Sequence, residues 1–245
     1  MSKNIVLLLT ATIDPRGVSI ARKNKEDRLN DYIKALQGWI NNSQVKKIVF
    51  CENSNSDLTR LKNLCLDLPA EKSIEFLSFD GLIDPPERGI GFGEMLIIEY
   101  AFKNSKLLST ADFVIKVTGR LYVRNINKLI VAVEKSQYID IWCDYRRYLT
   151  STVSFIFCAK VSYFQKYIIP FKNKVDERYK KSNFEHALAN AIHTSMAAAH
   201  HWRPLPFTPR ITGISASRNR AYNSSLLFWI FREIYRKTRE AVLER

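Results

Sequence analysis

Short apolar runs alternate with longer segments of helical spacing along the first 135 residues. Apolar runs typical of buried strands cover residues 4–10, 45–51, 74–79 and 113–117. Between and after them, apolar positions recur every three or four residues over 28–41, 58–66, 94–108 and 126–135, which predicts amphipathic helices. Strands that alternate with helices indicate βαβ units. We therefore predict an α/β fold with a Rossmann-type, mostly parallel sheet and helices on both of its faces.

The alternation changes after about residue 137. Residues 139–143 and 152–159 have the pattern of two strands close together, and residues 162–169 and 184–195 have helical spacing. A proline-rich connection at 203–210 cannot be regular helix. We predict one domain over residues 1–222, followed by a basic amphipathic helix over 223–245.

Composition and charge limit the class of protein. Of the 245 residues, 46% are hydrophobic and 25% are charged, which is ordinary for a globular protein, and no apolar run is long enough to cross a membrane. The four cysteines show no paired spacing, which argues against a disulfide framework or a zinc site. A formal net charge of +14 favours anionic partners. The basic residues are scattered, which disfavours a dedicated nucleic-acid binder, so no nucleic-acid partner is expected.

Polar side chains stand where the predicted strands end, and an open α/β sheet binds its ligands beyond those ends. They are Thr10 and Thr12 after the first strand, Glu52 and Asn53 after the second, Lys116, Thr118, Gly119 and Arg120 at the fourth, and Asp144 and Arg146 after the next. Any one of them could simply mark where the chain meets water. Together they predict a binding site at this edge of the sheet.

A glycine-rich turn, Gly89-Ile-Gly91-Phe-Gly93-Glu94, precedes the predicted helix at 94–108. Glycines let the backbone approach a ligand closely, and a helix start offers free N–H groups to an anion. The turn is neither a Walker loop nor a Rossmann fingerprint. It is therefore either part of a ligand site or a plain loop-to-helix turn.

The glycine turn, the strand end Lys116-Val-Thr-Gly-Arg120 and the later segment Ile211-Thr-Gly213-Ile-Ser215-Ala-Ser217 occur in the same order in a known group of enzymes. With these motifs the chain resembles bacterial glycosyltransferases of O-antigen and capsule gene clusters. That group is similar to the wider GT-A fold, which binds a nucleotide-sugar. The likeness extends over most of residues 4 to 225.

One departure from the GT-A pattern concerns the metal. Many GT-A enzymes end the fourth strand in an Asp-x-Asp motif that holds a divalent cation, whereas here Thr118-Gly119-Arg120 stands in that place. Arg120 could supply the positive charge that the metal otherwise supplies against the leaving diphosphate. Alternatively, Arg120 is structural and pairs with Asp144 or Glu94. We expect no metal site and no cofactor apart from the nucleotide-sugar substrate.

The resemblance also assigns roles to the candidate residues. Asp144 and Glu185 are the candidate bases, with Arg120 as the third catalytic residue. Donor binding is expected from Thr10, Thr12, Glu52, Asn53, Gly91, Gly93, Glu94, Lys116, Thr118, Gly119 and Arg120. Acceptor or phosphate contacts are expected from Arg146, His186, Arg210 and Ser215.

The function expected from the sequence is transfer of a sugar from a nucleotide-sugar, UDP-linked by the resemblance, to a lipid-linked or growing bacterial surface glycan. The C-terminal helix would hold this enzyme on the anionic inner face of the cytoplasmic membrane. Two alternatives remain open at this stage. One is a non-catalytic basic α/β module that binds nucleic acid or anionic membrane, and the other is a sugar nucleotidyltransferase.

Overall fold

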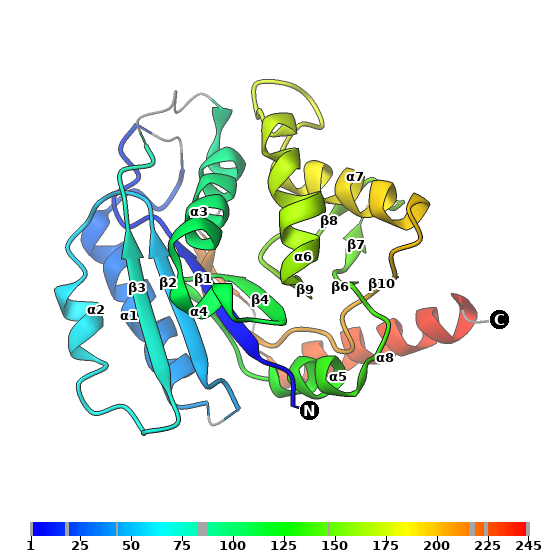
Figure 1. The fold of residues 1–245 in the computed structure, drawn as a ribbon, viewed down its shortest axis with the longest axis horizontal. Helices are drawn as coiled ribbons and strands as arrows, with labels where there is room; N and C mark the ends of the chain where they lie inside the picture. Colours follow the sequence, from blue (N-terminus) through cyan, green and yellow to red (C-terminus); the bar gives the residue numbers. More distant parts are fainter. Residues whose placement is uncertain are drawn as a thin grey trace.

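The computed structural model describes residues 2–17, 20–42, 44–82, 88–146, 148–215, 219–222 and 225–243. Within these ranges the chain forms a seven-stranded sheet in the order β10-β6-β9-β4-β1-β2-β3 (Figure 1). Four neighbouring strands are parallel: β1 (Ile5–Ala11), β2 (Lys47–Glu52), β3 (Ser73–Ser78) and β4 (Phe113–Thr118). The strand β9 (Ile156–Lys160) runs antiparallel to β4 and to β6 (Ile141–Trp142), and β10 (Trp202–Arg203) is parallel to β6.

Helices cover both faces of this sheet, as the sequence predicts. One face packs against α1 (Lys25–Ile40), α2 (Thr59–Asn63) and α5 (Asn127–Lys135). The other packs against α3 (Ile90–Asn104), α4 (Lys106–Ser109), α6 (Val161–Tyr163), η2 (Phe164–Ile168), η3 (Ile169–Lys174) and α7 (Phe184–Ala197). The predicted α/β class, with a mostly parallel sheet between two helical layers, is confirmed.

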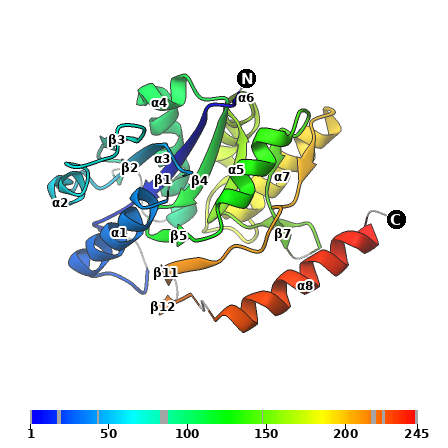
Figure 2. The same ribbon diagram turned by 90° about the horizontal axis from the view of Figure 1, so that it is seen from below.

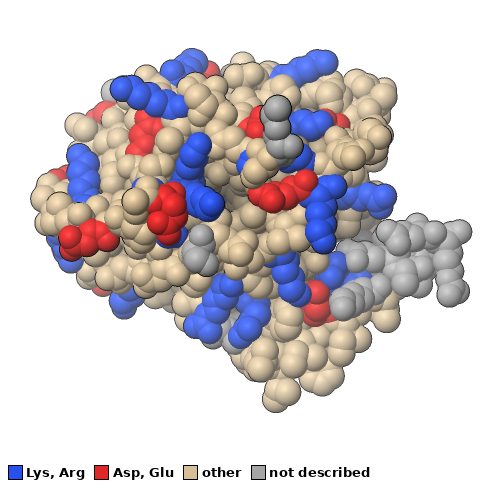
Figure 3. Space-filling view, turned by 60° about the horizontal axis from the view of Figure 1, so that its bottom comes forward, with Lys and Arg blue, Asp and Glu red and all other residues tan. Residues whose placement is uncertain are grey.

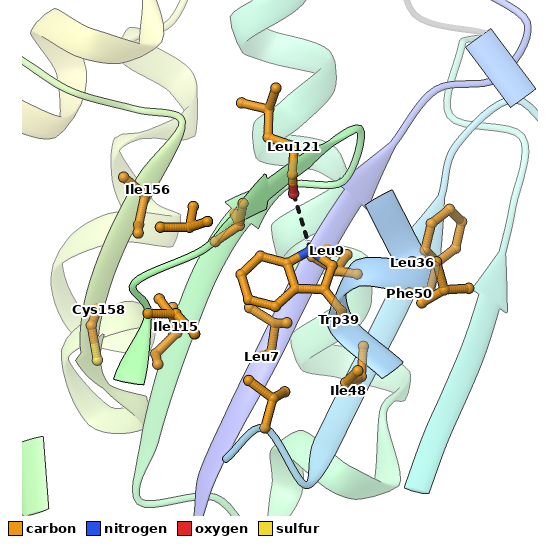
Figure 4. Close-up of a cluster of buried hydrophobic side chains, with 14 of the residues drawn as sticks. Leu7, Leu9, Leu36, Trp39, Ile48, Phe50, Ile115, Leu121, Ile156 and Cys158 are labelled. Atoms are coloured by element: carbon orange, nitrogen blue, oxygen red, sulfur yellow. Dashed lines mark hydrogen bonds between the residues drawn. The ribbon is translucent and has the colours of Figure 1, made fainter. Parts of the chain in front are cut away.

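The side chains of β4 alternate between the two faces, as a pleated strand requires. Ile115 joins the core beneath α1, where Trp39 packs and donates from Nε1 to the carbonyl of Leu121 at 3.0 Å (Figure 4). Val114 joins the core beneath α3 and α7. Lys116, two positions along, therefore points to the same side as Val114 and is completely buried there.

Smaller elements sit beyond the carboxyl ends of the parallel strands. The strands β5 (Leu121–Val123), β11 (Ile211–Ser215) and β12 (Arg220–Ala221) form an antiparallel sheet in the order β12-β11-β5, and β7 (Tyr145–Arg146) pairs with β8 (Ser151–Thr152). The helix α8 (Leu226–Leu243) follows at the edge of the molecule (Figure 2).

Several predicted boundaries were wrong. The helix expected at 94–108 begins at Ile90 and ends at Asn104, because Ser105 takes an extended conformation and its hydroxyl caps the next helix through Leu108 N–H. The strand expected at 152–159 is divided into β8 and β9, and the helix expected at 162–169 is a succession of short α, π and 3₁₀ turns. The strands β10, β11 and β12 were not predicted, because strands of two to five residues carry little periodic signal.

Candidate active site

A cavity of about 1160 Å³ opens beyond the carboxyl ends of β1, β2 and β4, where the sequence predicts the site. Its wall also includes the start of α3, the start of α7, the segment before α7, and β12. The predicted residues that line it are Thr10, Thr12, Asn53, Gly91, Gly93, Glu94, Thr118, Arg120, Arg146, Glu185, His186 and Ser215. Five other predicted residues are not among its lining residues: Glu52, Lys116, Gly119, Asp144 and Arg210.

The loop after β1 is held in place from beneath. Arg28, almost fully buried, donates from Nε to the carbonyl oxygen of Thr12 at 2.8 Å. The Thr12 hydroxyl then donates to Asn53 Oδ1 at 2.6 Å, so the ends of β1 and β2 present their polar groups together. The buried carboxylate of Glu52 accepts from the N–H groups of Ile13 and Ser54. Glu52 therefore shapes this loop from below and does not face the cavity.

Glu94 is the most strongly anchored acid of the cavity. Its Oε1 accepts from the Thr10 hydroxyl at 2.8 Å, from Lys116 Nζ at 2.5 Å and from the Thr118 hydroxyl at 3.3 Å. The same ammonium group donates to the carbonyl oxygen of Ser154 at 2.7 Å. Burial lowers the pKa of Lys116, and the Glu94 carboxylate opposes that effect. Lys116 thus acts beneath the cavity floor and fixes the acid that lines it.

Ser154 connects this pair to a second acid. Its carbonyl accepts from Lys116, while its hydroxyl donates to Glu185 Oε1 at 2.8 Å. Glu185 stands in the first turn of α7, a position where a carboxylate is favoured by the helix dipole. The two acids Glu94 and Glu185 therefore belong to one hydrogen-bonded network along the cavity wall.

Arg120 lines the cavity, and its side chain is held by a main-chain carbonyl. Its Nε donates to the carbonyl oxygen of Ile214 on β11 at 3.0 Å, and within the described residues no carboxylate forms an ion pair with it. The ion pair with Asp144 or Glu94 that a structural role was expected to bring is not found among the described residues. Its guanidinium is tethered on one edge and lines the cavity.

Gly213 explains part of the third sequence motif. It has φ of +138°, and a Cβ at this position would lie 2.5 Å from the carbonyl oxygen of Arg120. Only glycine lets β11 approach the strand end this closely. Ser215 of the same motif lines the cavity, whereas Ser217 lies outside the described residues.

Asp144 and Arg210 do not line the cavity, where the sequence analysis placed them, and contact other segments of the chain. Asp144 Oδ1 accepts from the N–H of Leu205 at 2.9 Å, which ties the proline-rich connection to the end of β6. Arg210 lies over the ring of Trp229 in α8, 5.4 Å from its centroid. The main-chain N–H of Gly119 donates to the carbonyl oxygen of Thr10 at 2.8 Å. These contacts join segments around the site, and none of the three residues lines the cavity.

Glu177 is a cavity residue that the sequence analysis missed. Its Oε1 accepts from the N–H of Gly91 at 2.8 Å, so a carboxylate of the protein itself occupies the start of α3. Gly89 has φ of +90°, and a Cβ there would lie 2.3 Å from Glu177 Oε2. The φ of Gly89 thus requires glycine, Glu177 packs against the turn, and that N–H of Gly91 is already used.

The pKa of Glu177 is raised by partial burial of its carboxylate and by the like charges of Glu185 and Glu94. When the pKa of a carboxyl group is raised in the folded state, its protonated form contributes stability below the unfolded-state pKa of about 4.3. That stability is lost as pH rises through the folded-state pKa. We expect the melting temperature of Glu177→Gln to exceed that of the wild type by a margin that grows as pH rises from 4 to 8. Melting curves against pH test this, with exposed Glu71→Gln as the matched control. A constant difference across that range would contradict it.

Basic side chains surround the remaining rim. Arg146, Lys180, Lys181 and Arg220 are exposed and line the cavity together with Arg120. His186 is buried and is oriented by a contact of 2.5 Å from its Nδ1 to Asn183 Oδ1. With Arg28, which also lines it, six cationic groups and three acids share the cavity, a composition suited to a ligand that carries both phosphate and hydroxyl groups.

Neither a metal centre nor a membrane-spanning helix is found in the part of the chain that the structure describes. No group of three or more His, Cys, Asp or Glu side chains there is arranged to hold a metal ion. In the same residues, no helix combines the length and apolar character needed to cross a bilayer. All four cysteines are free thiols.

Comparison with known proteins gives likeness of fold only. No protein-family model matches the sequence, and no curated protein matches it. The glycosyltransferase GlyE of Streptococcus pneumoniae TIGR4 aligns at 11% identity and a TM-score of 0.48 over 84% of this chain and 46% of its own. This chain therefore spans about half the length of GlyE.

Two further solved structures align similarly. A protein of Desulfovibrio desulfuricans G20, assigned as a nucleotide-diphospho-sugar transferase, shows 9% identity and a TM-score of 0.46 over 84% of this chain and 80% of its own. The 4-diphosphocytidyl-2C-methyl-D-erythritol synthase of Anaerococcus prevotii DSM 20548 shows 11% identity and a TM-score of 0.45 over 96% and 99%. At such identities and TM-scores the likeness assigns no activity to this chain.

Proposed function

We propose that this protein is a GT-A-like glycosyltransferase that moves a sugar from a nucleotide-sugar, UDP-linked, to a lipid-linked or growing bacterial surface glycan such as O-antigen, lipooligosaccharide or capsule. The observation that carries the proposal is the cavity at the carboxyl ends of β1, β2 and β4, which is lined by Arg120 and by the two networked acids Glu94 and Glu185. The sequence motifs supply the donor class and the glycan.

The donor would lie with its nucleoside against the ends of β1 and β2 and its diphosphate against Arg120. Thr12 and Asn53 offer polar groups to a base or ribose. Arg120 would neutralise the charge that develops on the leaving nucleoside diphosphate, which a guanidinium does well through two parallel N–H groups. The described residues offer no set of metal ligands, so we derive no step through a metal ion.

The acceptor hydroxyl would lose its proton to Glu185, while Glu94 would hold a sugar hydroxyl. In this step a bond forms between the acceptor oxygen and the anomeric carbon, and the bond from that carbon to the diphosphate oxygen breaks. Glu185 lines the cavity and Asp144 does not, so Glu185 becomes the better candidate base.

Nucleotide binding tests the proposal first. Melting temperatures would be measured with UDP, GDP, CMP and dTDP, each with and without EDTA, because a ligand that binds only the folded state raises the melting temperature. We expect UDP to give a rise that survives EDTA. A rise that EDTA abolishes would retain the transferase and overturn the metal-independent account.

Two further assays, of diphosphate release and of binding to DNA or anionic vesicles, separate the two alternatives. A sugar nucleotidyltransferase would release diphosphate from a nucleoside triphosphate and a sugar 1-phosphate, which the proposal does not predict. A non-catalytic basic module would show no rise with any nucleotide, and its binding to DNA or anionic vesicles would fall steeply with salt. Either result would replace the proposal.

We further propose that α8 docks this enzyme on the anionic inner face of the cytoplasmic membrane, as a unit following the domain at residues 1–222. The helix contacts the domain through polar groups: Trp229 Nε1 donates to the carbonyl of Thr208 at 2.6 Å, and Glu233 accepts from the N–H of Thr208. Although burial of the carboxylate acts in the opposite direction, hydrogen bonds from Arg236 and Thr208 lower the pKa of Glu233 to about 2.

The apolar side of α8 faces outward. Its exposed large side chains are Leu226, Leu227, Ile230, Phe231 and Ile234. On a helical wheel these five side chains share one stripe. On the face of the molecule shown in Figure 3, Lys and Arg predominate over Asp and Glu. An apolar stripe beside basic groups fits an anionic bilayer, in which the stripe is buried and the cations meet the head groups. The boundary at 223 and the side chains of Lys237 and Arg239 lie outside the described residues.

Serine at Leu227 or Phe231, which are 70% and 71% exposed, is expected to weaken vesicle binding about tenfold each. Sedimentation with vesicles of phosphatidylcholine and phosphatidylglycerol measures this, with phosphatidylcholine alone as the comparison. Leu66→Ser removes an equally exposed leucine elsewhere and should bind as the wild type does. If the α8 variants sediment like the wild type, the helix does not dock on the bilayer.

A further inference from the structure

A second cavity, of about 460 Å³, lies beside the first and shares Thr150, Lys181 and His186 with it. Its other lining residues are Tyr148, Leu149, Asn190 and His193. Because His186 follows Glu185 in α7, the shared edge lies next to the candidate base. A molecule seated in the second cavity could therefore present a group to the first.

The loop that forms one wall is held in an uncommon conformation. Tyr148 and Leu149 are consecutive residues with φ of 55° and 68°, in the left-handed region that non-glycine residues rarely adopt. Such residues carry backbone strain and cluster where ligands bind. Their surroundings must therefore compensate for this conformation.

His193 supplies that support. Its Nε2 lies 3.0 Å from the carbonyl oxygen of Leu149, and since a carbonyl only accepts, Nε2 is the donor. The imidazole ring itself packs against Tyr145, with centroids 5.2 Å apart. The loop is thus fixed to α7 by a side chain that also lines the second cavity.

The supported loop carries Tyr148, which lines the second cavity. Tyr148 is fully exposed, although an aromatic side chain gains most when it is covered. A sugar ring has an apolar C–H face that can cover an aromatic ring and hydroxyl groups that need donors and acceptors. The Asn190 amide, with two donors and one acceptor, and the Lys181 ammonium, with three donors, line the same cavity.

We propose that the second cavity binds the terminal sugar residue of the acceptor, with its apolar face on the ring of Tyr148 and its hydroxyls on Asn190 and Lys181. This inference rests on the proposed glycosyl transfer. The acceptor hydroxyl then crosses the shared edge at His186 and reaches Glu185, which takes its proton as the new glycosidic bond forms. The cavity is a specificity site for the acceptor, and Tyr148 and Asn190 do not line the first cavity, in which the donor would lie.

The test compares KM values for the two substrates. Transfer from the UDP-sugar found active would be measured to a panel of p-nitrophenyl glucoside, galactoside and N-acetylglucosaminide. Tyr148→Ala is expected to raise the acceptor KM about tenfold more than the donor KM, since aromatic stacking contributes on that scale. Asn190→Ala is expected to act in the same direction. Tyr148→Phe keeps the ring and should retain most of the acceptor affinity.

The control is Tyr138→Ala, which removes an exposed tyrosine that lines neither cavity. Saturation-transfer NMR with the same glycosides measures acceptor binding without turnover, and Tyr148→Ala should lose the signal. An unchanged acceptor KM in active Tyr148→Ala would overturn this inference and leave glycosyl transfer intact. Failure of the wild type to bind any nucleotide would instead overturn the proposed function, and the inference with it.

Discussion

Replacing Lys116 with methionine is expected to lower the free energy of unfolding by about 3 kcal/mol, or the melting temperature by about 6–12 °C. The ammonium is completely buried, and it is shared between Glu94 Oε1 and the carbonyl of Ser154. Methionine fills a similar volume but leaves the Glu94 carboxylate without its cation. Removing one partner of a buried ion pair costs far more than the intact pair contributes, because a charge is left uncompensated.

The double substitution Lys116→Met with Glu94→Gln separates charge from packing. The glutamine amide is neutral and its oxygen can still accept from Thr10 and Thr118, so a substantial part of the lost stability should return. The matched control is Lys103→Met, which breaks an ion pair with Glu99 on the exposed side of α3 and should cost about 0.5 kcal/mol or less. Denaturant unfolding of all four proteins gives the comparison. A double variant no more stable than Lys116→Met alone would show that the charge is not what matters.

The edge of the sheet that holds the site was predictable because the rule behind it is geometric. Parallel strands bring their carboxyl ends to one edge, so Thr10, Asn53 and Thr118 could be grouped without knowledge of any contact between them. Lys116 was assigned to the ligand although strand alternation places it with buried Val114. That alternation, applied to Lys116, would have predicted a buried partner within the protein in place of a ligand.

What the sequence could not predict are contacts between segments far apart in the chain. Glu177 meets Gly91 across 86 residues, and Arg120 meets Ile214 across 94. Neither contact follows from a periodic pattern, since each depends on how loops close over the finished sheet. The glycines at 89 and 213 were visible as motif positions, but their reasons, a facing carboxylate and a facing carbonyl, belong to the tertiary structure.

Arg120→Ala is expected to weaken nucleoside diphosphate binding by about ten- to a hundredfold and to lower kcat by about a hundredfold or more. The side chain is tethered by one bond to Ile214, and it lines the cavity without a carboxylate partner in the described part of the chain. A cation without an internal counter-charge is available to an anionic ligand. Its loss should therefore affect phosphate binding far more than folding.

The comparison with Arg124→Ala makes this prediction specific. Arg124 is exposed, donates from Nε to Thr212 on the same strand β11 at 2.9 Å, and does not line the cavity. The two variants thus lose the same charge and a similar tether to β11, and of the two side chains Arg120 lines the cavity whereas Arg124 does not. Arg120→Lys should recover little, because an ammonium cannot hold Ile214 and two phosphate oxygens in one plane. Calorimetric titration with UDP measures all three. Equal affinity in Arg120→Ala and Arg124→Ala would mean that Arg120 does not bind the diphosphate and that Lys180, Lys181 or Arg220 must supply the charge instead.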